Sequence, residues 1–330
     1  MAVLLLRLLR PVVRISSLVA PRLTGRLAFR AFCSPPRAKQ GLNSGPAVKS
    51  TGGRLGKATR VSVPFPCGSV SAYVCEPRPE VARNPAQSVV LLHGWTGEAA
   101  SMSAFVAPLL NAGFRVVAYD LPAHGQSTGV ELNVPIGVAS LAAVARAFAP
   151  VHAIVSHSFG GSIALAALAG TVPSQPRVTV ERLAMICPPS SLAQVTRRFG
   201  TTIGLGKRGQ AALEARIHSV AGTPVTAFEG ADQLARFSAP TLLVHCRDDK
   251  EVGFAHAEAL AGAGPFVQLH AMQGLGHRRI LQSRHVAAIV ADFVAGRAAT
   301  KSTQTQPINS RRTTASIAST PSAEAFRQGR

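Results

Sequence analysis

The sequence of 330 residues is poor in acidic side chains, in aromatic side chains and in cysteine. Asp and Glu number 15 against 35 Lys and Arg, which gives a formal net charge of +20, and aromatic residues make up 5% of the chain. Such an excess of positive charge is typical of proteins that bind nucleic acid. Hydrophobic residues nevertheless account for 47% of the sequence, which predicts a globular body and excludes a chain that is disordered throughout.

The positive charge is concentrated at the two ends of the chain. Residues 1–60 hold 12 Lys/Arg and no Asp/Glu, residues 61–296 hold 17 against 14, and residues 297–330 hold 6 against 1. These regions carry +12, +3 and +5, so the central region is close to neutral. Because the central region is the one expected to fold, we predict no nucleic-acid partner.

The few cysteines, at positions 33, 67, 75, 187 and 246, are odd in number and include no Cys-x-x-Cys pair. This pattern excludes a disulfide framework and a zinc site built from thiolates, and it favours a reducing compartment. Cys67 and Cys75 lie in a predicted hairpin and could face each other. We expect both to be free and buried as small hydrophobic residues.

A long apolar run is also missing, because arginines and Pro11 interrupt the Leu/Val-rich start of the chain. A transmembrane helix, which needs roughly 20 apolar residues, is therefore not expected. The arginines recur at helical spacing on both sides of Pro21, at positions 7, 10 and 14 and at positions 22, 26 and 30. This spacing predicts two short basic amphipathic helices within an N-terminal arm, residues 1–33.

The arm has several interpretations. One prediction is a cytoplasmic protein whose arm lies on the anionic inner face of the membrane. Another is that the arm packs its Leu/Phe face on the body or on another subunit. An arginine-rich leader without acidic residues is also typical of a mitochondrial presequence. A disordered start is a further alternative. A secretory signal fits poorly, because the arginines fall within the apolar region.

Residues 34–60 are predicted to be a linker, residues 61–297 a folded domain, and residues 298–330 a disordered tail rich in Ser, Thr, Gln and Arg. The domain begins with an antiparallel hairpin between Val61 and Pro77. Short apolar runs follow, each predicted to be a strand: Ser88–Leu92, Arg115–Tyr119, Ala153–Ser156, Leu183–Ile186, Thr241–Val244 and Val267–Ala271.

Stretches with helical periodicity separate most of these runs, namely Met102–Ala112, Ile136–Phe148, Ser162–Ala169 and Ala255–Leu260. Apolar strands alternating with helices predict an α/β domain whose mostly parallel sheet has helices on both faces. Residues 190–238 contain helical fragments but no clear strand, so they are predicted to form a small helical cap at the carboxyl edge of the sheet. Ligands of such sheets bind at this edge.

One strand runs into a sharp turn with Ser158 at its apex and a helix after it. Such a turn needs small residues two positions before and after the apex. Gly160 meets this need, while Ser156 stands where glycine is usual and is expected to adopt a backbone geometry easier for glycine. The pattern predicts that Ser158 is a nucleophile; the alternative is a plain turn with Ser158 as helix N-cap.

A serine nucleophile needs a base held in place by an acid. Two adjacent carboxylates, Asp248 and Asp249, end the strand that begins at Thr241, and His277 follows the last strand within a Gly-Leu-Gly-His sequence. The order Ser158, Asp249, His277 is the order of one particular scaffold.

The chain resembles the α/β-hydrolase family over residues 61–296. The resemblance rests on His93-Gly-Trp-Thr-Gly97 as the oxyanion loop, on the Asp120-Leu-Pro-Ala-His-Gly-Gln-Ser127 loop, on Asp249-Lys-Glu-Val252 and on Gly276-His277. The ending Gly-Leu-Gly-His-Arg-Arg-Ile-Leu is similar to that of bacterial members with a short cap and a basic N-terminal arm.

The resemblance implies that Ser158 attacks a carbonyl, that His277 transfers the proton and that Asp249 orients the base. The backbone N–H groups of Trp95 and Phe159 would hold the oxyanion. His93, Gly94 and Gly160 would support this geometry, as Asp120 and His124 would support their own loop. We expect one of Arg278 and Arg279 either to pair with Asp248, joining the acid and base loops, or to face an anionic substrate group.

The sequence therefore predicts a serine hydrolase that cleaves a carboxylic ester, thioester or amide of a small molecule. The alternatives are an acyltransferase with the same chemistry and a binding protein that retains the fold without turnover. No cofactor is predicted, and no metal, because His245 and His256 lack partners at metal-ligand spacing. Gly204-Leu-Gly-Lys-Arg-Gly209 matches a dinucleotide motif in letters but follows no clear strand, so it is not predicted to bind a nucleotide.

Overall fold

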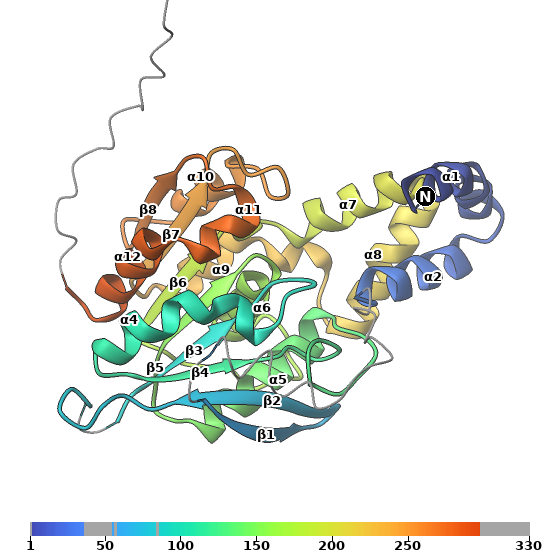
Figure 1. The fold of residues 1–330 in the computed structure, drawn as a ribbon. Coiled ribbons are helices and arrows are strands. Elements are labelled where there is room, and N and C mark those ends of the chain that lie inside the picture. The colour runs from blue at the N-terminus through green and yellow to red at the C-terminus, as the bar shows by residue number, and fades with distance from the viewer. Residues whose placement is uncertain (1, 36–54, 56–57, 84–85, 298–330) are drawn as a thin grey trace, which may run out of the picture. The chain divides into compact units, whose positions relative to one another are not determined.

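The computed structural model describes residues 2–35, 55, 58–83 and 86–297 (Figure 1). The predicted tail and most of the predicted linker lie outside these residues. Among the described residues, no helix is both long enough and apolar enough to cross a membrane.

The sheet has eight strands in the order β1-β2-β4-β3-β5-β6-β7-β8. The hairpin β1–β2 is antiparallel and pairs with β4 in antiparallel fashion, and all remaining pairs are parallel. The strands are β1 (Thr59–Phe65), β2 (Gly68–Cys75), β3 (Ser88–Leu92), β4 (Arg115–Tyr119), β5 (Val151–His157), β6 (Arg182–Ile186), β7 (Thr241–Cys246) and β8 (Val267–Met272). The expected α/β architecture with a mostly parallel sheet is therefore confirmed.

Two apolar clusters cover the two faces of the sheet, because successive residues of the apolar strands point to opposite sides. Val90 and Leu92 of β3 join one cluster, while Val89 and Leu91 join the other. Helices that supply the first cluster include α5 (Val134–Ala147), α6 (Phe159–Ala169), α9 (Gly230–Phe237) and α10 (Ala255–Ala261). Those that supply the second include η1 (Ala99–Phe105), α4 (Val106–Asn111) and α12 (Arg284–Val294).

The region between β6 and β7 is helical, with α7 (Leu192–Ile203), α8 (Lys207–Ala221), η2 (Val225–Phe228) and α9. Helix α9 packs on α6, with Leu234 fully buried, so it belongs to the helical layer over the sheet. The N-terminal arm forms α1 (Ala2–Val19) and α2 (Pro21–Cys33), and both helices pack on α7 and α8 (Figure 1). Pro21, which cannot donate a backbone hydrogen bond, is the first residue of α2.

All five cysteines are free. The expectation that Cys67 is buried was wrong: Cys67 is exposed, because it lies in the tight turn between β1 and β2. The hairpin itself begins at Thr59, inside the range predicted to be linker.

Candidate active site

Ser158 stands at the turn between β5 and α6 with a backbone of φ 50° and ψ −122°. Residues with a Cβ seldom adopt a positive φ, so the Ser158 backbone is strained, and the surrounding structure must hold it in this conformation. The Ser158 N–H donates to the Ile186 carbonyl (2.9 Å), and its own carbonyl accepts from the Gly161 N–H (2.8 Å). The turn therefore holds the Ser158 side chain beyond the end of the strand. The side chain makes no capping hydrogen bond to α6, which argues against the alternative that it serves only as a helix N-cap.

Ser156 does not carry the expected strain. Strand β5 continues through His157, and Ser156 has ordinary strand geometry with a fully buried side chain. Its neighbour across the turn is Gly161, where an added Cβ would lie 3.7 Å from the Ser156 Oγ. The unusual backbone conformation therefore falls on Ser158 and not on Ser156.

Asp249 follows β7 and is buried, with 7% of its surface exposed. Its Oδ1 accepts from the N–H groups of Glu251 and Val252, each at 2.8 Å. Burial would raise the pKa of this carboxyl, but hydrogen bonds from His277 and from these N–H groups outweigh it and lower the pKa to about 2. Asp249 is therefore ionised at neutral pH.

His277 lies in the short helix α11 (Gly276–Arg279) that follows β8, and it joins the two residues expected to act with it. Its Nδ1 lies 2.7 Å from Asp249 Oδ2, and its Nε2 lies 3.0 Å from Ser158 Oγ. Since Asp249 is ionised, Nδ1 carries the proton, and Nε2 is free to accept the hydroxyl hydrogen of Ser158. Three residues from widely separated segments thus form one hydrogen-bonded chain.

Two glycines allow the loop after β3 to approach the Ser158 turn. A Cβ on Gly94 would lie 2.9 Å from the Ser158 Cβ, and one on Gly160 would lie 2.8 Å from the Leu92 carbonyl oxygen. Among the described residues, no group accepts a hydrogen bond from the N–H of Trp95, and Phe159 is the first residue of α6, where a helix leaves its N–H groups without an internal partner. Both predicted oxyanion donors are therefore free.

The loop that carries Trp95 is held by histidines and by Asp120. His93 is fully buried, accepts the Leu121 N–H at Nε2 (2.9 Å) and donates from Nδ1 to the Gly94 carbonyl (2.7 Å). Burial lowers the pKa of His93 to about 3, so the ring is neutral. His124 accepts the Thr96 N–H (3.2 Å), and Asp120 accepts the N–H groups of Ala99 (2.7 Å) and Gln126 (2.9 Å).

Asp248 forms no ion pair with Arg278 or Arg279, so the expected pairing was wrong. Arg278 instead binds Glu251 in bidentate fashion at 2.8 and 3.1 Å, because Glu251, and not Asp248, faces α11. Asp248 accepts the N–H of Gly274 at 2.8 Å. Besides the Asp249–His277 contact, the acid and base loops are therefore joined through Glu251 with Arg278 and through Asp248 with Gly274.

Three further side chains lie around this site. His157, the residue before Ser158, donates from Nε2 to the His277 carbonyl (3.0 Å), and burial lowers its pKa to about 3. Cys187 and His245, at the ends of β6 and β7, lie beside Asp249. Only the order of strands in the sheet brings these two next to the acid, so no local pattern reveals them.

Cys187, His245 and Asp249 also have the geometry of a possible metal-binding group. Their ligand atoms lie within 4.8 Å of one another, and all three residues are buried. In the present arrangement the His245 Nε2 donates to the Val252 carbonyl (2.8 Å), and the Asp249 oxygens already accept hydrogen bonds. His245 therefore does have neighbours in space that its spacing in the sequence did not reveal.

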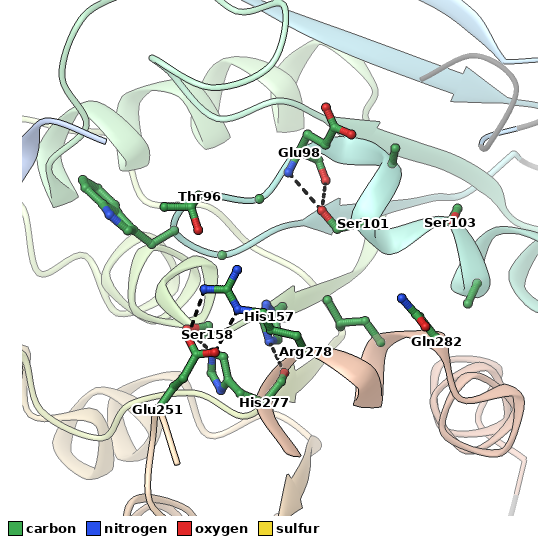
Figure 2. Close-up of a pocket in the computed structure, with 16 residues that line it drawn as sticks. Thr96, Glu98, Ser101, Ser103, His157, Ser158, Glu251, His277, Arg278 and Gln282 are labelled. Carbon is green, nitrogen blue, oxygen red and sulfur yellow. Dashed lines mark hydrogen bonds and ion pairs between the residues drawn. The ribbon is translucent and has the colours of Figure 1, made fainter. Parts of the chain in front are cut away.

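Ser158, His157 and His277 border a cleft of about 660 Å³ (Figure 2). Figure 2 shows Ser103 and Gln282 far along the cleft from Ser158, with the Glu251–Arg278 pair beside His277. Trp95, Ala100, Ala104 and Leu281 supply apolar surface. The other side chains with polar groups that line the cleft are Thr96, Glu98, Ser101, Ser103, Glu251, Arg278 and Gln282.

The model of the alpha/beta hydrolase family matches residues 89–292 of this chain. None of the curated proteins compared with the chain matches it. Among solved structures, the chain is similar to an esterase from Pyrococcus furiosus, with a TM-score of 0.54 and 19% identity over 79% of this chain and 97% of that one.

Two further structures are similar, a proline iminopeptidase from Mycobacterium smegmatis and the thioesterase domain of the curacin biosynthetic pathway. The first has a TM-score of 0.51 and 20% identity over 72% of this chain and 98% of that one. The second has a TM-score of 0.51 and 17% identity over 72% of this chain and 99% of that one. At such identities the likeness establishes the fold, which is shared by proteins with different activities.

Proposed function

The chain belongs to the alpha/beta hydrolase family, and we propose that it is a serine hydrolase that cleaves a carboxylic ester through Ser158, His277 and Asp249. One observation carries the proposal. Ser158 Oγ, the His277 ring and the Asp249 carboxylate are linked by contacts of 3.0 and 2.7 Å at the edge of a cleft. This is the arrangement that makes a serine hydroxyl nucleophilic.

In the proposed reaction, His277 Nε2 takes the hydroxyl proton of Ser158 as Oγ attacks the ester carbonyl. The new C–O bond gives a tetrahedral intermediate, and the protonated His277 then gives its proton to the departing alcohol, which leaves an acyl group on Ser158. Asp249 remains ionised throughout and stabilises the positive charge on His277. Water, activated by the same histidine, then releases the acid and restores Ser158.

The negative oxygen of the intermediate would be held by the free N–H groups of Trp95 and Phe159. The indole of Trp95 rests edge-on against the Phe159 ring, with ring centroids 5.6 Å apart, which supports a fixed position for the two donors. Losing one such donor typically lowers turnover on the order of 100-fold to 1,000-fold. Because both donors are backbone groups, side-chain substitutions in this loop would act through its geometry.

The exposure of the cleft favours hydrolysis over transfer of the acyl group to another alcohol. Arg278 and Glu251 line the cleft beside His277, and their side chains are 65% and 48% exposed. Water therefore has access to an acyl group on Ser158, whereas an acyltransferase must exclude it. The polar groups along the cleft further favour esters of short or polar acids over those of long fatty acids.

Labelling with a fluorophosphonate probe tests the nucleophile. We expect the intact chain and its Ser162→Ala variant to be labelled, and the Ser158→Ala variant to be unlabelled. Ser162 lies one helical turn beyond Ser158 and serves as the matched control. A folded intact chain that is not labelled, or a Ser158→Ala variant that still is, would contradict the proposal. A series of p-nitrophenyl esters of increasing chain length then tests the preference for short acyl groups.

A further inference from the structure

The exposed large apolar side chains of the protein are gathered on one small part of it. Among the described residues, nine such side chains are exposed, and only Val81 and Val130 lie outside α1 and α2. We call the other seven the arm surface: Leu9, Val12, Ile15, Leu18, Val19, Leu23 and Leu27. Contiguous exposed apolar surface is unusual on a protein and marks a place of interaction.

Helix α1 has its polar side turned to the protein and its apolar side turned outward. Ser17 is fully buried against α8, while Val12, Ile15 and Val19 on the opposite side of the helix are 61%, 62% and 81% exposed. An amphipathic helix of a globular protein normally has the reverse orientation. The Arg10 guanidinium, on the inward side, donates to the Thr201 carbonyl at 3.2 Å.

The glycines of the Gly204–Gly209 segment explain this orientation. A Cβ on Gly204 would lie 2.8 Å from the Arg10 Cβ, and one on Gly209 would lie 2.9 Å from the Ser17 Cβ. The Gly206 N–H donates to Ser17 Oγ at 3.2 Å. Helix α1 thus packs on the Gly204–Gly209 segment, whose sequence matches a dinucleotide-binding motif. The close contact at these glycines favours the polar side of α1 over its apolar side.

Helix α2 is also fixed in the protein by its inner side. Phe29 and Cys33 are 6% and 1% exposed, and a Cβ on Gly25 would lie 2.6 Å from the backbone of Ala212 in α8. Leu23 and Leu27, on the outer side, are 58% and 55% exposed. Helix α1 therefore holds its apolar side outward on a packed base, while α2 buries its aromatic side and adds Leu23 and Leu27 to the outer surface. Neither helix can turn without losing these contacts.

Arginines accompany the arm surface. Arg14, Arg22, Arg26 and Arg30 are exposed, and none of them forms an ion pair with a described residue. Residues 1–60 contain no Asp or Glu. A second copy placed against this surface would bring two sets of arginines together, so the charges disfavour self-association. A partner with negative charges above an apolar interior would match both the exposed apolar side chains and the arginines.

We propose that α1 and α2 dock this protein on an anionic lipid bilayer. The arm surface would enter the boundary between head groups and acyl chains, where a helix lying in the plane of the membrane buries its apolar side. The arginines, whose long side chains can extend to the head groups, would bind the lipid phosphates. The proposal depends only on the arm and is independent of the proposed reaction.

Flotation of the full-length protein with lipid vesicles tests the apolar part of the proposal. We expect the protein to float with phosphatidylcholine vesicles that contain phosphatidylglycerol. The triple variant Val12→Ser, Ile15→Ser, Val19→Ser should bind at least about tenfold more weakly, because it removes three apolar side chains from the interface. The matched control, Val81→Ser with Val130→Ser, removes the exposed valines outside the arm and should bind like the original protein.

A second variant tests the charge. Replacing Arg14, Arg22, Arg26 and Arg30 with Gln should remove the preference for vesicles with phosphatidylglycerol over pure phosphatidylcholine. Each arginine near the surface contributes about 1 kcal/mol to binding of the anionic vesicles, which corresponds to a fivefold change in affinity. The control Arg78→Gln, at an exposed arginine outside the arm, should leave the preference unchanged. Thermal unfolding of each variant shows whether it is folded.

Three outcomes would overturn the proposal. The first is that the original protein does not float with anionic vesicles. The second is that the triple variant floats as well as the original protein. The third is that light scattering shows the original protein as a dimer and the triple variant as a monomer. The last result would assign the arm surface to an interface between copies. Because none of these measurements uses an ester, they remain decisive even if the protein fails to react with the fluorophosphonate.

Discussion

The site at the carboxyl ends of the strands and the N-terminal arm place their side chains in opposite ways. In the site, Asp249 and His277 are 7% and 8% exposed, and each has its hydrogen-bond partners within the protein. In the arm, Ser17 is buried while Val19 is 81% exposed. Buried polar groups with internal partners have a geometry that the fold alone determines, whereas exposed apolar groups gain free energy only when something else covers them.

The largest effect is expected for Asp249→Asn, which tests whether the buried network of the site performs catalysis. The amide cannot hold the His277 proton on Nδ1, so turnover should fall on the order of 10,000-fold. The neighbouring Asp248→Asn variant is the matched control, because Asp248 is exposed and accepts the Gly274 N–H. Ester hydrolysis by the two purified variants checks the prediction, and equal losses in both would show that Asp249 acts only through loop structure.

A smaller effect is expected for His157, which we interpret as a positioning residue for His277. His157→Leu removes the N–H that binds the His277 carbonyl, and turnover should fall about 10-fold to 100-fold with little change in KM, because the base moves from its position. His157→Gln retains a donor and should recover much of the loss. If both variants lowered thermal stability equally and left turnover unchanged, His157 would have a packing role only.

The parts of the site that local sequence predicts are those that one turn of chain determines. Ser158 stands in a strand-turn-helix segment, and Asp249 and His277 each lie in the loop after a strand, so local sequence places all three at the same edge of the sheet. The choice of Asp249 over Asp248 came from the family resemblance. The partner of Arg278 could not be predicted, because Glu251 and Asp248 are separated by only two intervening residues and the twist of a loop decides which of them faces α11.

The orientation of the arm was beyond the sequence for a different reason. Helical spacing shows that α1 has an apolar side and a polar side, and the general tendency of proteins to bury apolar groups then favours the apolar side as the inner one. The actual choice depends on Gly204 and Gly209, which are nearly 200 positions away in the chain and leave room only for a close approach. A contact of this kind has no signal in the pattern of either segment alone.

Acid unfolding provides a third test of the site. The folded-state pKa of Asp249 is depressed from 3.8 to about 2, so its ionised form stabilises the protein above pH 3.8, and this contribution is lost as the pH falls toward 2. The Asn variant lacks it at every pH. The difference in unfolding free energy between the original protein and Asp249→Asn should therefore shrink by about 2 kcal/mol on acidification, as measured by urea unfolding. A difference independent of pH would contradict the depressed pKa.

The smallest effect is expected at Gly25, and here the sign separates an arm that is part of the fold from a leader that is not. In an exposed helix, Gly→Ala stabilises by roughly 0.5 to 1 kcal/mol. In this structure the new methyl group would lie 2.6 Å from the backbone of Ala212, so α2 must move away from α8. Gly25→Ala should therefore destabilise the full-length protein by about 1 to 3 kcal/mol in thermal or urea unfolding.

Leu27→Ala, on the outer side of the same helix, should change stability by less than about 0.5 kcal/mol. Stabilisation by Gly25→Ala would mean that α2 does not rest on α8 in solution, and the fixed base from which the arm surface projects would be lost.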